Sequence, residues 1–214
     1  MNSTPIASGA VRRLDITSQT PLEVQPVVLE GHAVRLEPLT VRHADGLSAI
    51  ADRDEIWQFM STAPRKPEEL QRWIDDALKD QAAGTALPFA IVDRNENRVV
   101  GSTRYLAIAA RDRGLEIGWT WHSPSVWRTA INTECKLLLL RHAFETLGCL
   151  RVQFKTDARN ERSRRAIERV GASFEGILRN HMIVRAGVVR DSAYYSVIDT
   201  EWPDVKAGLI ARIR

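Results

Sequence analysis

The chain has 214 residues, of which 44% are apolar and 27% are charged. This composition is typical of a globular protein and excludes a disordered or fibrous chain. The length supports one domain, or one domain with a tail, rather than two separate enzymatic domains. Lys and Arg number 30 against 27 Asp and Glu, an excess too small to indicate a nucleic-acid partner.

The cysteines and the apolar segments bear on the compartment. Cys135 and Cys149 are isolated and lack CxxC spacing, so the sequence predicts neither a metal site nor a disulfide framework. No segment approaches the roughly 18 consecutive apolar residues of a membrane span. The first 14 residues contain no apolar stretch typical of a signal peptide. We therefore expect a cytoplasmic protein without a membrane partner.

Residues 1–26 mix Ser, Thr, Gln and Pro without a helical or alternating pattern, which predicts a flexible extension. Residues 27–214 then form a single domain. In chain order, its patterns predict a strand at 32–39, helices at 42–52 and 67–83, strands at 87–93, 98–108 and 114–122, a loop at 123–132, a helix ending at 148, a strand at 151–157, a helix at 160–171, strands at 173–184 and 190–200, and a last helix from Pro203.

The strand at 114–122 has a strict alternation. One set of side chains is apolar and is expected to be buried on a single face, and the other set is mostly polar and faces the opposite side. The apolar set is Leu115, Ile117, Trp119 and Trp121, and the other set is Glu116, Gly118, Thr120 and His122.

The order strand, loop, helix, strand, helix over residues 114–171 resembles the GCN5-related N-acetyltransferase superfamily, and the likeness extends over about residues 28–212. The segments 132–145, 152–157, 190–191 and 195–197 are similar in particular to bacterial ribosomal-protein N-terminal alanine acetyltransferases. This resemblance implies an α+β fold with a mixed, splayed sheet of about seven strands flanked by helices. It also implies that acetyl-coenzyme A lies between the strands at 114–122 and 151–157.

The resemblance places the coenzyme diphosphate at the start of the helix after the loop. A helix N-terminus offers unpaired N–H groups and a positive dipole end, so it suits this task. The superfamily pattern Q/R-x-x-G-x-G/A is replaced here by Trp127, Ala130 and Asn132 at its defining positions. The residues expected to contact the coenzyme are Arg128, Thr129, Ala130, Ile131, Asn132 and Thr133.

The residues of this loop allow more than one way of binding a phosphate. Ala130 cannot take a positive φ as cheaply as Gly, and Arg128 could compensate by its charge. Asn132 or Thr133 could cap the helix. Glu134 would repel a phosphate unless its side chain points away. A plain capped helix without coenzyme is the alternative interpretation.

Acetyl transfer from a thioester needs a neutral amine, a polarised carbonyl and a stabilised thiolate. Glu116 is the candidate base, and the alternative is a cross-strand partner for Arg104 or Lys155. His122 is a second candidate base, or else a surface residue. By resemblance, backbone N–H groups around Trp119, Thr120 and Trp121 polarise the thioester carbonyl.

The thiolate partner departs from the common superfamily pattern. A Tyr is expected seven residues after Asn160, but Ile167 stands there. In the ribosomal-protein type, Ser163 takes this role. Asn160 contacts the coenzyme, serves as helix N-cap, or does both. Tyr194 and Tyr195 alternate, so one faces the core and the other could face the amine site.

The resulting hypothesis is an acetyl-CoA-dependent N-acetyltransferase that works by direct attack of an amine in a ternary complex. The acceptor is the N-terminal amine of a protein, by resemblance a ribosomal one, or a small amine. The alternative is a non-catalytic module that binds CoA, or binds RNA through the arginine-rich helix at 160–171. A homodimer is compatible with either hypothesis.

Overall fold

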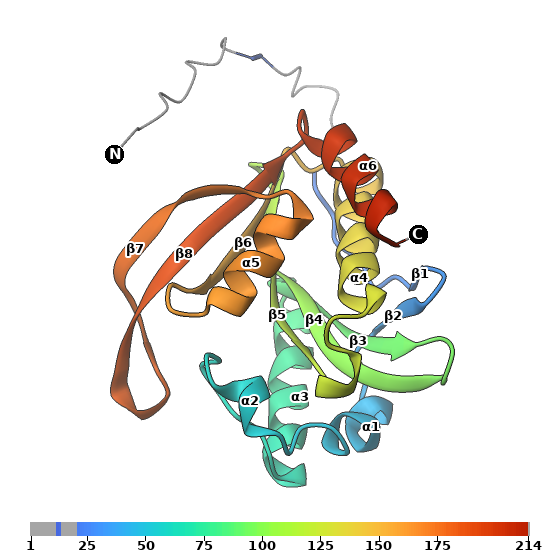
Figure 1. Ribbon diagram of the computed structural model, residues 1–214, viewed down its shortest axis with the longest axis vertical. Helices are drawn as coiled ribbons and strands as arrows, with labels where there is room; N and C mark the ends of the chain where they lie inside the picture. The colour runs from blue at the N-terminus through green and yellow to red at the C-terminus, as the bar shows by residue number, and fades with distance from the viewer. Residues whose placement is uncertain (1–11, 14–20, 214) are drawn as a thin grey trace.

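The computed structural model describes residues 12–13 and 21–213, and in this part the chain forms one eight-stranded sheet flanked by helices (Figure 1). The strand order is β1-β2-β3-β4-β5-β6-β8-β7, and all neighbours are antiparallel except β5 and β6. The strands are β1 Leu29–Glu30, β2 Val34–Pro38, β3 Ala86–Asp93, β4 Arg98–Ala109, β5 Gly114–His122, β6 Arg151–Asp157, β7 Ser173–Val184 and β8 Val188–Ile198. The predicted mixed sheet is therefore confirmed, with the two-residue β1 as an additional edge.

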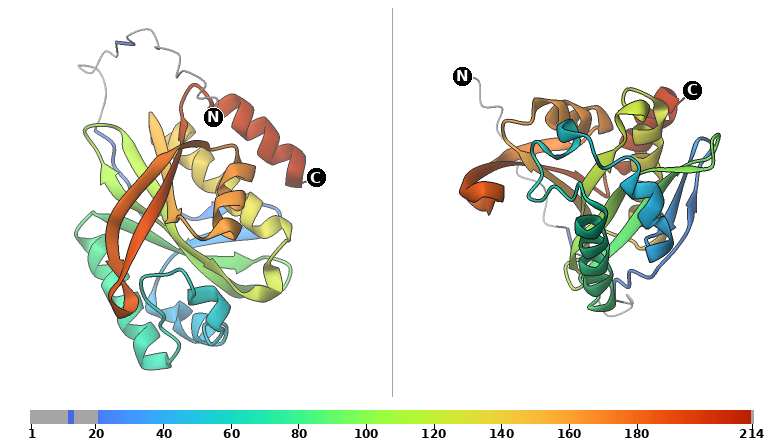
Figure 2. Two further views of the ribbon diagram at one scale, coloured as in Figure 1. Left: turned by 60° about the vertical axis from the view of Figure 1, so that its left-hand side comes forward. Right: turned by 90° about the horizontal axis from the view of Figure 1, so that it is seen from below.

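The helices lie on both faces of the sheet (Figure 2). Helices α1 to α3 enclose a smaller core with Trp121 of the sheet, and α4 and α6 enclose a larger core on the other face. The α-helices are α1 Ala44–Ser48, α2 Asp54–Trp57, α3 Pro67–Ala82, α4 Ala130–Arg141, α5 Glu161–Val170 and α6 Trp202–Ile213. A π-helix at His142–Thr146 extends α4, and short 3₁₀ turns lie at Val41–His43, Pro124–Val126 and Arg185–Gly187.

Two predicted helices differ from the observed ones. The helix expected at 42–52 is a 3₁₀ turn followed by α1, which ends at Ser48, and the short α2 has too few residues to show a period. The helix expected after residue 132 begins at Ala130, because the side chain of Thr129 caps it.

The extension expected at 1–26 lies largely outside the described residues. Within the described part, Leu22 is 5% exposed and belongs to the larger core. This part of the segment is therefore packed against the domain.

Strands β5 and β6 are paired over only three residues and then diverge. They pair in parallel only at Gly114, Leu115 and Glu116, opposite residues 151–153. Beyond Glu116, β5 continues along β4 and β6 continues along β8. The sheet is therefore splayed at the position that the sequence resemblance implied (Figure 1).

A β-bulge at Trp119 changes which side chains of β5 face which core. Trp119 has φ 50°, and the register runs from Arg104 opposite Gly118 to Ser102 opposite Trp121, so β5 has one extra residue here. Ile117 consequently lies in the larger core, whereas Trp121 lies in the smaller one. The predicted single buried face is wrong beyond Ile117, because the bulge reverses the alternation.

Candidate active site

The splayed half of the sheet has one apolar face and one polar face. Phe154 and Tyr195 are buried in the larger core. Because side chains alternate along a strand, their neighbours point to the opposite side. The polar face comprises Glu116 of β5, Gln153 and Lys155 of β6, and Ser192 and Tyr194 of β8.

Glu116 stands at the last paired position of β5 before the strands part. It is 2% exposed, and its Oε2 lies 3.4 Å from Lys155 Nζ and accepts a 3.0 Å hydrogen bond from Gln153 Nε2. A Cβ on Gly118 would lie 2.8 Å from Oε1, so only a glycine leaves room for this carboxylate. The ion pair with Lys155, which the sequence offered as the alternative to a base role, is present.

Arg104 has other partners. Its guanidinium lies 4.4 Å from the ring centroid of Trp73 and 5.1 Å from that of Trp119, and its Nη1 lies 3.7 Å from Asp80. Burial lowers the Arg104 pKa to about 10, which the Asp80 carboxylate opposes. Arg104 therefore packs between the rings of Trp73 and Trp119 and does not form an ion pair with Glu116.

Helix α4 starts in a form suited to anion binding. Thr129 is its N-cap, and the Thr129 hydroxyl accepts from the N–H of Ile131 at 3.3 Å. The expectation that Asn132 or Thr133 caps the helix is wrong, because both lie inside its first turns. The positive φ of the loop falls on Arg128, at 64°, so Ala130 needs none.

Glu134 points away from the start of α4. Its carboxylate accepts hydrogen bonds from the backbone N–H groups of His32, Ala33 and Val34 at 2.6, 2.8 and 2.9 Å. It therefore binds the turn before β2 instead of opposing an anion at the helix.

Helix α5 follows β6 directly and begins beside the parted strands. Asn160 is its N-cap, since Oδ1 accepts from the N–H of Ser163 at 3.0 Å, and Gly171 ends it at φ 101°. The capping role expected for Asn160 is confirmed. Ser163 is partly exposed on the first turn, and Ile167 is buried.

The arginines of this helix are engaged within the protein. Arg162 lies 4.0 Å from the Trp127 ring centroid, Arg164 donates to the Tyr195 hydroxyl at 3.0 Å, and Arg165 pairs with Glu161 at 2.7 Å. Arg159 pairs with Asp157 at 2.8 Å. These contacts account for most of the positive cluster without a nucleic acid.

Two histidines lie in contrasting positions. His122 is 9% exposed, and burial together with nearby Lys136 lowers its pKa to about 3, so it is a poor base near neutral pH. His181 of β7, which the sequence did not single out, lies with Tyr194 and Ser192 of the polar face. The position of His181 in the sequence does not indicate this placement, because its contacts are with residues of β8 across the β7–β8 hairpin. Tyr195 faces the core, as the alternation allowed.

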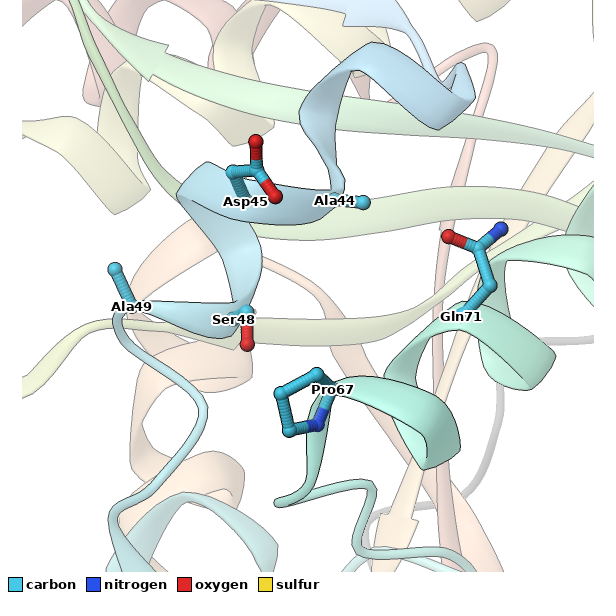
Figure 3. Close-up of a pocket in the computed structure, with 6 residues that line it drawn as sticks. All are labelled: Ala44, Asp45, Ser48, Ala49, Pro67 and Gln71. Carbon is cyan, nitrogen blue, oxygen red and sulfur yellow. The ribbon is translucent and has the colours of Figure 1, made fainter.

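A pocket on the described part of the chain lies away from the polar face. Figure 3 shows a pocket between α1 and α3, lined by Ala44, Asp45, Ser48, Ala49, Pro67 and Gln71, none of which belongs to the polar face. Among the described residues, no group of three potential metal ligands is assembled. In the same part of the chain, no helix is long and apolar enough to cross a bilayer.

Comparison with known proteins agrees with this architecture. The sequence model of the acetyltransferase (GNAT) domain matches residues 33–173. A GCN5-related N-acetyltransferase from Brucella melitensis superimposes with a TM-score of 0.86 and 33% identity, over 93% of this chain and 91% of the other.

Two further relatives are informative. YdaF of Bacillus subtilis (strain 168), a proposed ribosomal N-acetyltransferase, is 35% identical over 44% of this chain and 51% of its own. Mycobacterium smegmatis RimJ, solved in complex with CoA-disulfide, shares the fold with a TM-score of 0.74 and 23% identity, over 90% of this chain and 93% of its own. The family match and the Brucella structure establish the predicted resemblance: the chain belongs to the GCN5-related N-acetyltransferase (GNAT) family and is an acetyltransferase.

Proposed function

We propose that this enzyme transfers an acetyl group from acetyl-CoA to the N-terminal amine of a protein, by direct attack in a ternary complex. The observation that carries the proposal is the position of Glu116. Its carboxylate lies on the polar face at the residue where β5 and β6 part. A thioester held between the parted strands and an amine on the polar face would therefore meet beside it.

Acetyl-CoA is the cosubstrate of the GNAT family, and this chain has residues that fit it. We assign the diphosphate to the first turn of α4, with Arg128, Thr129, Ala130, Ile131, Asn132 and Thr133. Helix N-termini bind anions, and the capping Thr129 uses only one N–H of that turn. Arg162, stacked on Trp127 beside this loop, adds a second cation.

The proposed chemistry assigns one task to each group. Glu116 accepts a proton from the attacking nitrogen, and the backbone of Trp119, Thr120 and Trp121 polarises the thioester carbonyl. The Ser163 hydroxyl donates to the leaving thiolate, and the Asn160 amide contacts the coenzyme. A thiol has a pKa of about 8.5, so a hydroxyl donor suffices.

An α-amine suits a site with a single buried carboxylate. Its pKa of about 7.7–8.0 leaves an appreciable neutral fraction at pH 7, whereas a lysine amine at about 10.4 is almost wholly charged. The likeness to YdaF favours a ribosomal protein as the acceptor. We also propose a cytoplasmic location, consistent with two buried, unpaired cysteines, Cys135 and Cys149.

The test is CoA release from acetyl-CoA, followed with a thiol reagent, in the presence of three acceptor sets. These are N-terminal peptides of ribosomal proteins, the same peptides with a blocked α-amine, and small amines such as polyamines. We expect turnover with the free peptides alone, and mass spectrometry should locate the acetyl group on the α-amine.

Turnover only with small amines would replace the protein acceptor by a small one. Coenzyme binding without turnover on the whole panel would contradict the proposed acceptor class and the assigned role of Glu116.

A further inference from the structure

Acetylation of a charged amine releases more protons than one buried carboxylate can hold. An ammonium group loses two protons on becoming an amide N–H. One of them neutralises the departing thiolate, and the other must reach solvent. Glu116 is 2% exposed, so it cannot pass a proton directly to bulk water. When the α-amine binds in its charged form, which predominates at pH 7, the polar face therefore needs a second proton acceptor that water can reach.

His181 has the geometry for this task. Its Nε2 lies 3.3 Å from the Tyr194 hydroxyl, and its Nδ1 lies 3.0 Å from Ser192 Oγ. Arg190 Nε donates to the same Ser192 oxygen at 3.2 Å, which leaves that oxygen a lone pair for a proton on Nδ1. In this tautomer, Nε2 accepts the hydrogen bond of the Tyr194 hydroxyl. Both His181 and Tyr194 are partly exposed.

Burial and the surrounding charges favour the neutral form of this histidine. Burial, together with Lys155 of β6 and Arg190 of β8, lowers the His181 pKa below its usual 6.5, while Glu116 of β5 opposes the shift. Burial also raises the pKa of Tyr194, with Glu116 adding to the shift, so the phenol does not ionise by itself. Tyr194 can therefore pass a proton on only as it receives one.

The geometry points to a proton relay from the acceptor ammonium through the Tyr194 hydroxyl to His181 Nε2. This inference rests on the proposed function and completes its amine site. The ammonium N–H bond breaks, the Tyr194 oxygen takes that proton, and the Tyr194 O–H proton moves to Nε2. The neutral amine then attacks the thioester carbonyl, the C–N bond forms and the C–S bond breaks. Its second proton passes by way of Glu116 to the thiolate, while His181 releases the first to water.

The decisive variant is His181→Gln, which keeps a polar side chain beside Tyr194 but cannot take up a proton. With acetyl-CoA and a peptide bearing a free N-terminal alanine, we expect kcat to fall at least about tenfold at pH 7. At pH 9.5 the α-amine is already neutral, so variant and wild type should agree within about twofold. Tyr194→Phe should show the same pH-dependent loss, and the double variant should lose no more than either single one.

Two controls separate the relay from a structural effect. His32→Gln alters an exposed histidine in the turn before β2 and should leave the pH profile unchanged. CoA affinity, measured by calorimetry, should be equal in wild type and His181→Gln. The rate of His181→Ala at pH 7 should recover in imidazole buffer but not in phosphate.

An equal loss of kcat at pH 7 and pH 9.5, or no loss at either, would overturn the relay while leaving the acetyltransferase proposal intact. If the wild-type enzyme acetylates no peptide N-terminus at any pH, it is the proposed acceptor that fails.

Discussion

Two glutamates of this protein are almost equally buried, but their surroundings differ. Glu134 of α4 is 5% exposed and accepts hydrogen bonds from three backbone N–H groups. Glu116 of β5 is 2% exposed, and its polar partners among the described residues are the side chains of Lys155 and Gln153. Backbone donors are fixed by the fold, whereas side-chain donors can rearrange. We therefore expect Glu134 to serve the structure and Glu116 to remain available to a substrate.

Both carboxylates also rest against a glycine. A Cβ on Gly31 would lie 2.5 Å from Glu134 Cδ, and one on Gly118 would lie 2.8 Å from Glu116 Oε1. The two sites thus form a matched pair, in which the same substitutions should have different consequences.

The largest effect is expected from Glu116→Gln. Removing a general base typically costs a hundred- to ten-thousandfold in rate, so kcat should fall by about that factor. The loss should persist at pH 9.5, because this proton leaves nitrogen only after attack. Steady-state kinetics with the alanine peptide at pH 7 and 9.5 gives the measurement, and a rate within about twofold of wild type would remove Glu116 from the chemistry.

Glu134→Gln should instead reduce stability. An amide presents an NH₂ group to at least one of the three N–H donors, so we expect unfolding free energy to fall by about 2–3 kcal/mol. Urea denaturation gives this value. The matched control is Glu116→Gln in the same assay, which should lose less, and equal losses would contradict the distinction between the two carboxylates.

Substitutions of Gly118 and Gly31 test the same difference between the two glutamates, with smaller expected effects. Gly118→Ala forces Glu116 to shift, so kcat should fall about tenfold as the base is displaced from its position. Gly31→Ala pushes on Glu134 and should lower the melting temperature with little change in kcat. If both variants affect only stability, the placement of Glu116 does not matter for the rate.

The smallest expected effect is that of replacing Lys136 on the free energy of unfolding. Lys136 is 6% exposed, its Nζ donates to Thr120 Oγ1 at 2.7 Å, and no carboxylate of the described residues lies within ion-pair distance. Burial lowers its pKa to about 8, below the unfolded value of about 10.4. Between these values the unfolded chain binds the extra proton, so this group makes stability rise with pH from 8 to about 10.4.

Lys136→Met should therefore stabilise the protein by about 1 kcal/mol at pH 7 and flatten this rise. Denaturation at pH 7, 9 and 10 tests both effects. A variant that is less stable at pH 7 would show that the ammonium is compensated by groups other than Thr120.

The sequence predicted most of the sheet, because runs of strand-forming residues bounded by turn residues mark its strands, and the helices α3 and α5 have clear boundaries at Pro67 and Gly171. It missed the bulge at Trp119, since an extra residue in a strand has no signature when the side chain is large. Because of this one extra residue, Trp121 lies in the smaller core, whereas Ile117 lies in the larger core.

The site was only partly accessible from sequence for a related reason. Glu116 was singled out because alternation places it on the opposite face from Leu115, in a strand that the family resemblance puts beside the acetyl group. His181 depends on Tyr194, which lies 13 residues away across a hairpin. The partners of Glu134 lie about a hundred residues earlier in the chain. Spacing along a strand or helix cannot encode contacts of this kind.

The hydrogen bonds of Glu134 to the turn before β2 couple the movement of α4 to that turn. Three amides at one margin of the sheet are fastened to the second turn of α4, so that helix cannot tilt without pulling the turn with it. Any displacement of the start of α4 would then be transmitted to the turn before β2. The turn before β2 thus anchors α4, the helix to which we assign the coenzyme diphosphate.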